Sequence, residues 1–309
     1  MAKELSNQAK WKPWKGVVLF VIALAIVIGG SILSIFIGTY GALVTQLGLL
    51  ATAIIACLIN KTPLKEVFPI KKLTVRDFFG TLLMWAGALP LGLTSAIAVG
   101  KLFPQTLENV VGGVNEIATS VVVIGFIITV ICPPICEEAI MRGAILSNFR
   151  GIKKDWIIIL IVGVMFGILH TDPVRFLNTS LLGACMAYLM VKRNNFILPM
   201  MFHLINNFVT IGISTLSSTL ATSAASEQAV DTSEAVSMAI DILPSMMILF
   251  CLCPMILVVG THLIKRQAEI SEGKEQTGMK LGKKVALSVI PCVLMLGCGI
   301  GLSVMNMAR

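Results

Sequence analysis

The chain has 309 residues, of which 56% are hydrophobic and 13% are charged, and its mean hydropathy is +0.91. A soluble domain of this length has no interior large enough to bury that much apolar surface, so the composition excludes an ordinary soluble enzyme or binding module. The formal net charge of +8 does not indicate a nucleic-acid partner, because the basic residues lie in short loops between apolar runs.

These apolar runs predict an all-α fold, a polytopic transmembrane helical bundle. A span needs about 20 mostly apolar residues, and the candidate runs are 16–38, 41–60, 78–100, 117–136, 156–170, 174–191, 196–214, 237–263 and 285–306. The runs 156–170 and 174–191 are short and separated only by Thr-Asp-Pro, so we expect eight or nine spans. No polar stretch is long enough to fold alone, and residues 1–309 are therefore expected to form a single membrane domain.

The first run, Val17 to Ile37, is longer than the apolar core of a signal peptide and lacks a convincing small-residue cleavage site, so we expect it to be a transmembrane helix. Lysines precede it, and basic residues recur in the loops 61–76, 150–155, 192–195 and 264–284. Short loops rich in Lys and Arg face the cytoplasm. With the spans drawn above, all these segments fall on one side, which predicts a cytoplasmic N-terminus.

The eight cysteines all lie within or beside apolar runs. Thiols in apolar helices usually serve as small packing residues. We therefore expect neither a disulfide framework nor a thiol-based metal site.

Ionisable residues inside membrane segments are costly, at about 2.5 to 3.5 kcal/mol for an acid or base at a helix centre, and are functional candidates by default. The first such place is the segment from Glu137 to Arg142, which follows an apolar run. On a helix, Glu138 and Arg142 are four residues apart in the order that favours an ion pair. Because adjacent residues differ by about 100° around a helix, Glu137 then faces elsewhere, toward a cavity. The alternative is a cytoplasmic helix end with solvated charges.

Two of the three histidines also lie in apolar runs. His170 closes the run that contains Phe166, and His203 shares a helix face with Asn207, four residues later. The His/Asn pair can join helices by hydrogen bonds, or it can present donors to a developing oxyanion. A glutamate, two histidines and an asparagine that converge in a dry cavity can activate water for amide hydrolysis.

The motifs EExxxR (Glu137 to Arg142), FxxxH (Phe166 to His170) and HxxxN (His203 to Asn207), in this order, resemble the CPBP family, also called ABI. Its members are intramembrane CAAX-type proteases and bacteriocin-processing or immunity proteins. The resemblance covers residues 115–215, which it implies are a four-helix catalytic core, and it implies a bacterial plasma-membrane location.

The resemblance further implies that Glu137 and His170 activate the attacking water, that His203 and Asn207 form the oxyanion hole, and that Glu138 and Arg142 are supporting structure. Phe166 is the aromatic residue of its motif. One glutamate and two histidines (Glu137, His170, His203) also suit zinc, and a metal-free mechanism with Glu137 as general base fits the same residues.

The leading hypothesis is an intramembrane endopeptidase, CAAX prenyl endopeptidase-like, that acts on a CAAX-like, pheromone or bacteriocin-type peptide or on a membrane-protein substrate. The alternatives are a non-catalytic scaffold or bacteriocin self-immunity protein on the same fold, and a proton-coupled transporter. The transporter would be favoured by inverted repeats, which the sequence does not contain. The expected convergence of His170 and His203 on Glu137 conflicts with this span assignment. His170 falls near the far end of its run, whereas His203 is about two turns from the cytoplasmic side.

Overall fold

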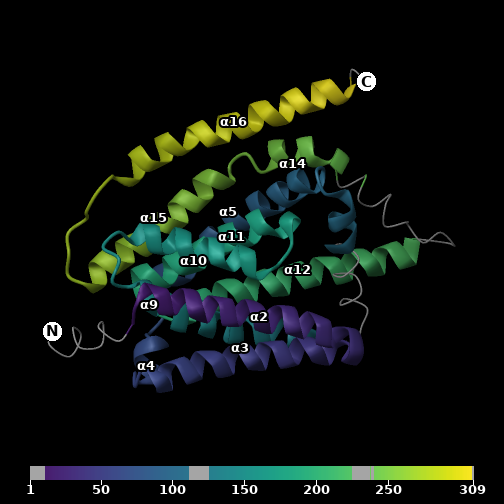
Figure 1. Ribbon diagram of the computed structural model, residues 1–309. Coiled ribbons are helices and arrows are strands. Elements are labelled where there is room, and N and C mark those ends of the chain that lie inside the picture. The colour runs from purple at the N-terminus through teal and green to yellow at the C-terminus, as the bar shows by residue number, and fades with distance from the viewer. Residues whose placement is uncertain (1–10, 111–124, 225–236, 238–239, 308–309) are drawn as a thin grey trace. The chain divides into compact units, whose positions relative to one another are not determined.

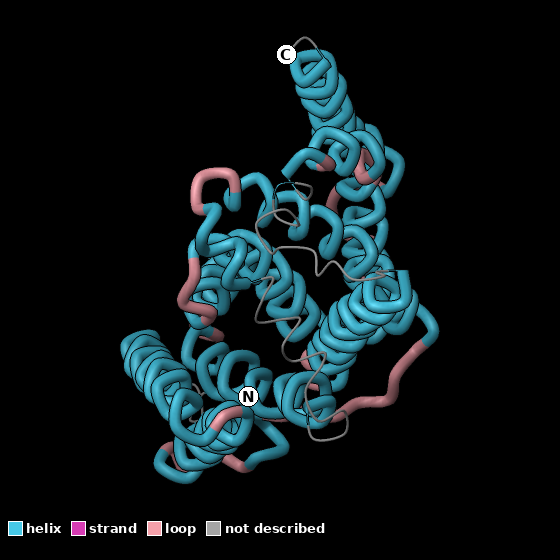
Figure 2. The backbone as a smooth tube through the Cα atoms, turned by 90° about the vertical axis from the view of Figure 1, so that its right-hand side faces the viewer, coloured by secondary structure: helices cyan, strands magenta, loops and turns pink. Residues whose placement is uncertain are grey.

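The structure is a computed structural model that describes residues 11–110, 125–224, 237 and 240–307, with the backbone alone for 214–224. Helices and their connections account for all of the described residues, and no strand occurs among them (Figures 1 and 2). The all-helical prediction is confirmed. The chain divides into two compact units, which comprise Met1–Leu73, Val121–Leu169 and Gly183–Val209 in the first, and Thr74–Ser120, His170–Leu182 and Thr210–Arg309 in the second. The prediction of a single membrane domain stays a prediction.

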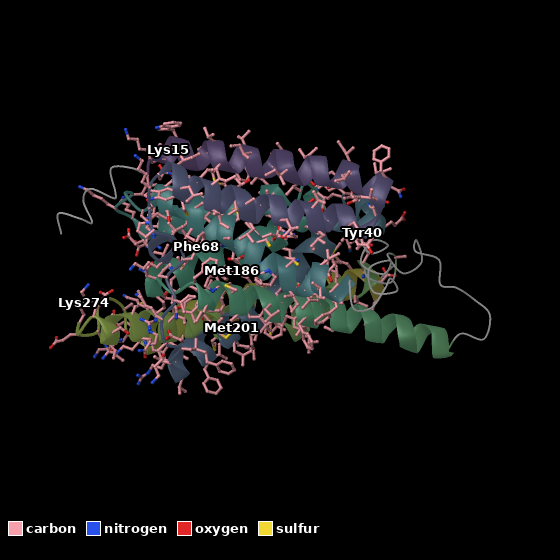
Figure 3. The ribbon with its side chains drawn as sticks, turned by 90° about the horizontal axis from the view of Figure 1, so that it is seen from below. Lys15, Tyr40, Phe68, Met186, Met201 and Lys274 are labelled. Carbon is pink, nitrogen blue, oxygen red and sulfur yellow. The ribbon has the colours of Figure 1, made fainter. Side chains whose placement is uncertain are left out.

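The first unit opens with two packed helices, α2 (Pro13–Ile37) and α3 (Thr39–Ile59). A proline starts α2, where its missing N–H costs nothing. Gly38 makes the turn between the helices at φ +59°, a conformation that side chains with a Cβ rarely adopt. Figure 3 shows Lys15 and Tyr40 at opposite ends of this pair.

The core of the first unit is a nearly continuous helical path made of four segments, η1 (Ile127–Ile131), α8 (Cys132–Glu138), η2 (Ala139–Ile145) and α9 (Leu146–Phe149). Every residue from Glu138 to Phe149 is buried. The short helix α4 (Leu64–Val67) follows α3, and α2 and α3 both pack against the path. The remaining helices of the unit are α10 (Asp155–Leu169), the second half of α11 (Pro173–Arg193) and the beginning of α12 (Ile197–Ala224).

The second unit is built on the close pairing of α5 (Val75–Gly100) with α15 (Cys253–Ser271). Thr74 and Asp77 form a capping box that fixes the start of α5. Glycines make the close pairing with α15 feasible, since a Cβ on Gly87 would lie 2.6 Å from the backbone nitrogen of Leu257. Helix α14 (Leu243–Leu249) packs against α16 (Leu281–Met307).

Five of the described helices are long and apolar enough to cross a membrane, and a sixth span results if α14 and α15 count as one. The structure therefore confirms a polytopic membrane protein, and the count of eight or nine spans stays a prediction. The predicted run 237–263 is divided, because α14 and α15 meet at a 46° bend. The 15 residues of α10 cover about 22 Å, less than the roughly 30 Å of a bilayer core. Residues 117–124 of the run 117–136 lie outside the described residues.

Candidate active site

The adjacent glutamates lie where two π-helical segments flank a short α-helix. Pro133 and Pro134 occupy the first turn of α8, and η1 precedes them. The N–H of Cys132 bonds the carbonyl of Ile127, five residues back, as in a π-helix. The helical path continues through these prolines from η1 into α8.

Glu138 is the centre of a buried charged cluster. Its Oε1 accepts a hydrogen bond from Arg142 Nη1 at 2.8 Å, and the Nδ1 of His203 lies 2.8 Å from the same oxygen. Glu138 and Arg142 are both 0% exposed, and His203 is 6% exposed. The predicted Glu138–Arg142 ion pair therefore forms. The contact between Glu138 and His203 was not predicted, since no sequence pattern relates two residues on different helices.

Arg142 joins this cluster to α10 and α11. Its Nη2 donates to the carbonyl of Gly183 at 3.0 Å, and its guanidinium lies 4.4 Å from the centroid of the Phe166 ring. The same ring meets His203 edge to face, with centroids 5.8 Å apart. Phe166 thus contacts both partners of Glu138, Arg142 through its ring face and His203 edge to face. Two buried atoms of the cluster, Glu138 Oε2 and Arg142 Nε, have no hydrogen-bond partner among the described residues.

Glu137 lies outside this cluster, as the helix geometry predicts. Its Oε1 accepts a hydrogen bond at 2.8 Å from Nε2 of Gln46 on α3. The Glu137 side chain is half-buried, and Gln46 is 9% exposed. The Oε1 of Gln46 is buried without a hydrogen-bond partner among the described residues. A polar atom of this kind at a site suits a water molecule or a substrate donor.

Gln46 is the site residue that the sequence reading missed. A signal was present, because Gln46 is a large polar residue in the otherwise apolar run 41–60. It carries no charge and belongs to none of the three motifs. Only the packing of α3 against α8 shows that it meets Glu137.

Asn207 donates from Nδ2 to the carbonyl of Thr129 at 3.0 Å. Thr129 lies four residues before Pro133, so its carbonyl is the one that the missing N–H of this proline would have bonded in an α-helix. Asn207 replaces that donor, as polar side chains do where proline frees a backbone group in a membrane helix. The predicted oxyanion role of Asn207 stays a prediction beside this structural contact.

His170 is half-buried and directly follows the last residue of α10. Its carbonyl accepts a hydrogen bond from Arg175 Nη2 at 3.4 Å, and Arg175 also pairs with Asp172. His170 begins the segment His170–Leu182 of the second unit, whereas the other predicted site residues belong to the first unit. The structure therefore brings together Glu138, Arg142, Phe166 and His203, with Glu137 and Asn207 bonded to other helices, and the approach of His170 to Glu137 stays a prediction.

The described residues do not gather a metal-binding set. No group of three or more His, Cys, Asp or Glu side chains among them is arranged to hold a metal ion. His203 directs Nδ1 to Glu138, and Glu137 bonds to Gln46 instead. A histidine that gives one ring nitrogen to a carboxylate can still bind zinc through the other, so zinc binding by Glu137, His170 and His203 stays a prediction.

The chain matches a known protein family over part of its length. Residues 119–209 match the family model "Rce1-like: Type II CAAX prenyl endopeptidase Rce1-like". The resemblance to the CPBP family is confirmed. Comparison with curated proteins and with solved structures found no match. The Rce1-like segment contains all three motifs but not Gln46, which the separate helix α3 brings to Glu137.

Proposed function

We propose that the chain is an intramembrane endopeptidase in which Glu137 is the general base. One observation carries the proposal, namely the different surroundings of the two adjacent glutamates. Glu138 is buried and bonded to Arg142 and His203, whereas Glu137 is half-buried and receives a neutral amide donor. When two neighbouring carboxylates have different surroundings, the difference indicates which of them carries out the acid–base chemistry.

In the proposed reaction, Gln46 holds Oε1 of Glu137, and Oε2 takes a proton from a water molecule. Oε2 has no hydrogen bond among the described residues, so it is the oxygen that can do so. The water oxygen bonds to the carbonyl carbon of the scissile peptide, and His170 helps to orient this water. Glu137 then gives the proton to the departing amine nitrogen as the C–N bond breaks.

His203 and Asn207 are the proposed oxyanion donors. When the Glu138 carboxylate accepts from Nδ1–H of His203, the ring can donate from Nε2 only if it carries both protons. Glu138 acts through His203, and its proposed contribution is to orient this donor rather than to touch the substrate.

The proposed substrate is a CAAX-like, pheromone or bacteriocin-type peptide, or a membrane protein cleaved near the bilayer surface. The test uses the full chain in lipid vesicles with farnesylated CAAX peptides and with unprenylated peptide precursors. A general base contributes about 10² to 10⁴-fold to rate, so Glu137→Gln is expected to lower kcat by that factor. The control is Glu272→Gln, at an exposed glutamate. Full activity of folded Glu137→Gln protein would refute the proposal.

A non-catalytic scaffold or self-immunity protein is the second candidate. It is favoured by one observation, that His203 and Asn207 each have a protein partner, in Glu138 and in the Thr129 carbonyl. This candidate requires Glu137→Gln to preserve immunity or partner binding in cells. The two candidates therefore make opposite predictions for one variant.

A further inference from the structure

A cavity of the first unit lies between α10 and α11, and none of the glutamates of the candidate site lines it. Its volume is about 700 Å³, and none of its lining residues belongs to the three motifs. One wall is formed by Trp156, Ile159 and Leu160, which share a face of α10, and the other by Ala184, Tyr188 and Lys192, which recur every fourth residue along α11. We refer to it as the α10–α11 slot.

The two helices are held together at each end of the slot. At the inner end they touch, since a Cβ on Gly163 would lie 2.9 Å from the Cβ of Ala184. At the outer end Lys192 Nζ pairs with Asp155 at 2.6 Å. Eight residues separate these points on each helix, so the slot is about 12 Å long.

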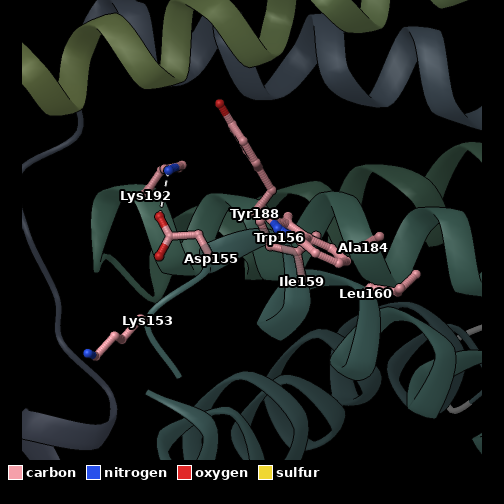
Figure 4. A pocket seen from close by; sticks show the side chains of 8 residues that line it. All are labelled: Lys153, Asp155, Trp156, Ile159, Leu160, Ala184, Tyr188 and Lys192. Carbon is pink, nitrogen blue, oxygen red and sulfur yellow. Dashed lines mark hydrogen bonds and ion pairs between the residues drawn. The ribbon is translucent and has the colours of Figure 1, made fainter. Parts of the chain in front are cut away.

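Charged residues lie only at the outer end of the lining. Figure 4 shows Lys153 and Lys192 there with Asp155 between them, and Trp156, Leu160 and Ala184 toward the other end. Because charges in the hydrocarbon are costly, we expect the outer end to lie at the membrane–water boundary. Trp156 and Tyr188 are the aromatic residue types that favour this boundary.

We propose that the α10–α11 slot binds one anionic phospholipid. Two lysines and one aspartate give the outer end a net charge of +1, which complements a headgroup that carries a single negative charge. The phosphate would lie between Lys153 and Lys192, and an acyl chain would run along Trp156 and Leu160 toward Ala184. A zwitterionic lipid offers no net charge to this end, and a free phosphate ion leaves the apolar walls exposed.

The slot also adjoins the buried cluster through the backbone. Its inner residue, Ala184, follows Gly183, whose carbonyl accepts the Arg142 hydrogen bond. The inner end of the slot therefore lies one residue from the backbone contact that holds Arg142. This proposal does not rest on the proposed protease activity, because its test measures lipid binding in the absence of substrate.

The experiment places the full chain in phosphatidylcholine vesicles that contain a rising fraction of brominated phosphatidylglycerol, which quenches tryptophan fluorescence. The signal of Trp156 is obtained by subtracting that of the Trp156→Phe chain. Phosphatidylglycerol is expected to be preferred at Trp156. One lysine near an anionic surface contributes about a fivefold preference, so Lys153→Ala and Lys192→Ala should each lower the preference by about that factor.

Two matched variants sharpen the test. Lys154→Ala removes an exposed lysine that adjoins Lys153 but does not line the slot, and it should leave the preference unchanged. Asp155→Asn removes the negative charge and should raise the preference. Equal quenching by brominated phosphatidylcholine in the unchanged chain, or an equal loss with Lys154→Ala, would overturn the proposal. So would displacement of the lipid by glycerol 3-phosphate or by a farnesylated peptide, because either result assigns the slot to another ligand.

Discussion

His203 on α12 lies 2.8 Å from the carboxylate oxygen of Glu138 that also receives Arg142. One oxygen thus joins two cationic or chargeable side chains from separate parts of the sequence. All three side chains are nearly or fully buried. Such a cluster is costly to assemble and more costly to break, because removal of one member leaves a buried charge without compensation.

We expect Glu138→Gln to destabilise the chain, because Arg142 keeps its charge at a fully buried position. Breaking a buried pair costs about 3 to 5 kcal/mol. Thermal unfolding of the detergent-solubilised protein measures the loss. The double variant Glu138→Gln/Arg142→Met removes both charges and should recover part of the stability, whereas a double variant no more stable than Glu138→Gln alone would show that the pair is not the cause.

Gln46→Leu should reduce peptide cleavage while leaving the fold intact. The substitution removes the donor to Glu137 Oε1 and replaces the amide with an apolar side chain of similar size. A hydrogen bond to a charged group contributes about 1.5 to 3 kcal/mol, so we expect kcat to fall by roughly 10 to 100-fold. Because Gln46 acts through Glu137, KM should stay unchanged. A rise in KM at constant kcat would instead place Gln46 in substrate binding.

Asn207→Ala should lower the free energy of unfolding, because the Asn207 side chain has a structural contact. The Thr129 carbonyl then loses its donor, at a cost of about 1 to 3 kcal/mol for an unsatisfied buried group. In a Pro133→Ala background the backbone N–H of residue 133 can supply that donor, so the cost should shrink. A double-mutant cycle of unfolding free energies measures the difference. Equal costs in both backgrounds would contradict this link.

Peptide cleavage by the purified chain should persist in a zinc chelator. The basis is that no group of three or more His, Cys, Asp or Glu side chains among the described residues is arranged to hold a metal ion. The assay compares initial rates with and without chelator, and after zinc is restored. Loss of activity that zinc restores would show that substrate-free and active arrangements of these side chains differ.

Some relationships in the site were predictable because they are local. The spacing of Glu138 and Arg142 predicted their ion pair, and the 100° between neighbours on a helix predicted that Glu137 faces elsewhere. The membrane class followed from composition alone. Helix type was not predictable in the same way, because π-helical turns at η1 and η2 have no distinct hydrophobic period.

The sequence by itself determined the apolar helices, the three motifs and the local pairing of Glu138 with Arg142, since each depends on residues within a few turns of one another. Only the tertiary structure decided that His203 binds Glu138, that Asn207 completes the helix ahead of Pro133, and that Gln46 reaches Glu137. Those contacts join helices that are 65 to 91 residues apart in sequence. Their geometry is set by packing between helices, which no spacing along a single chain specifies.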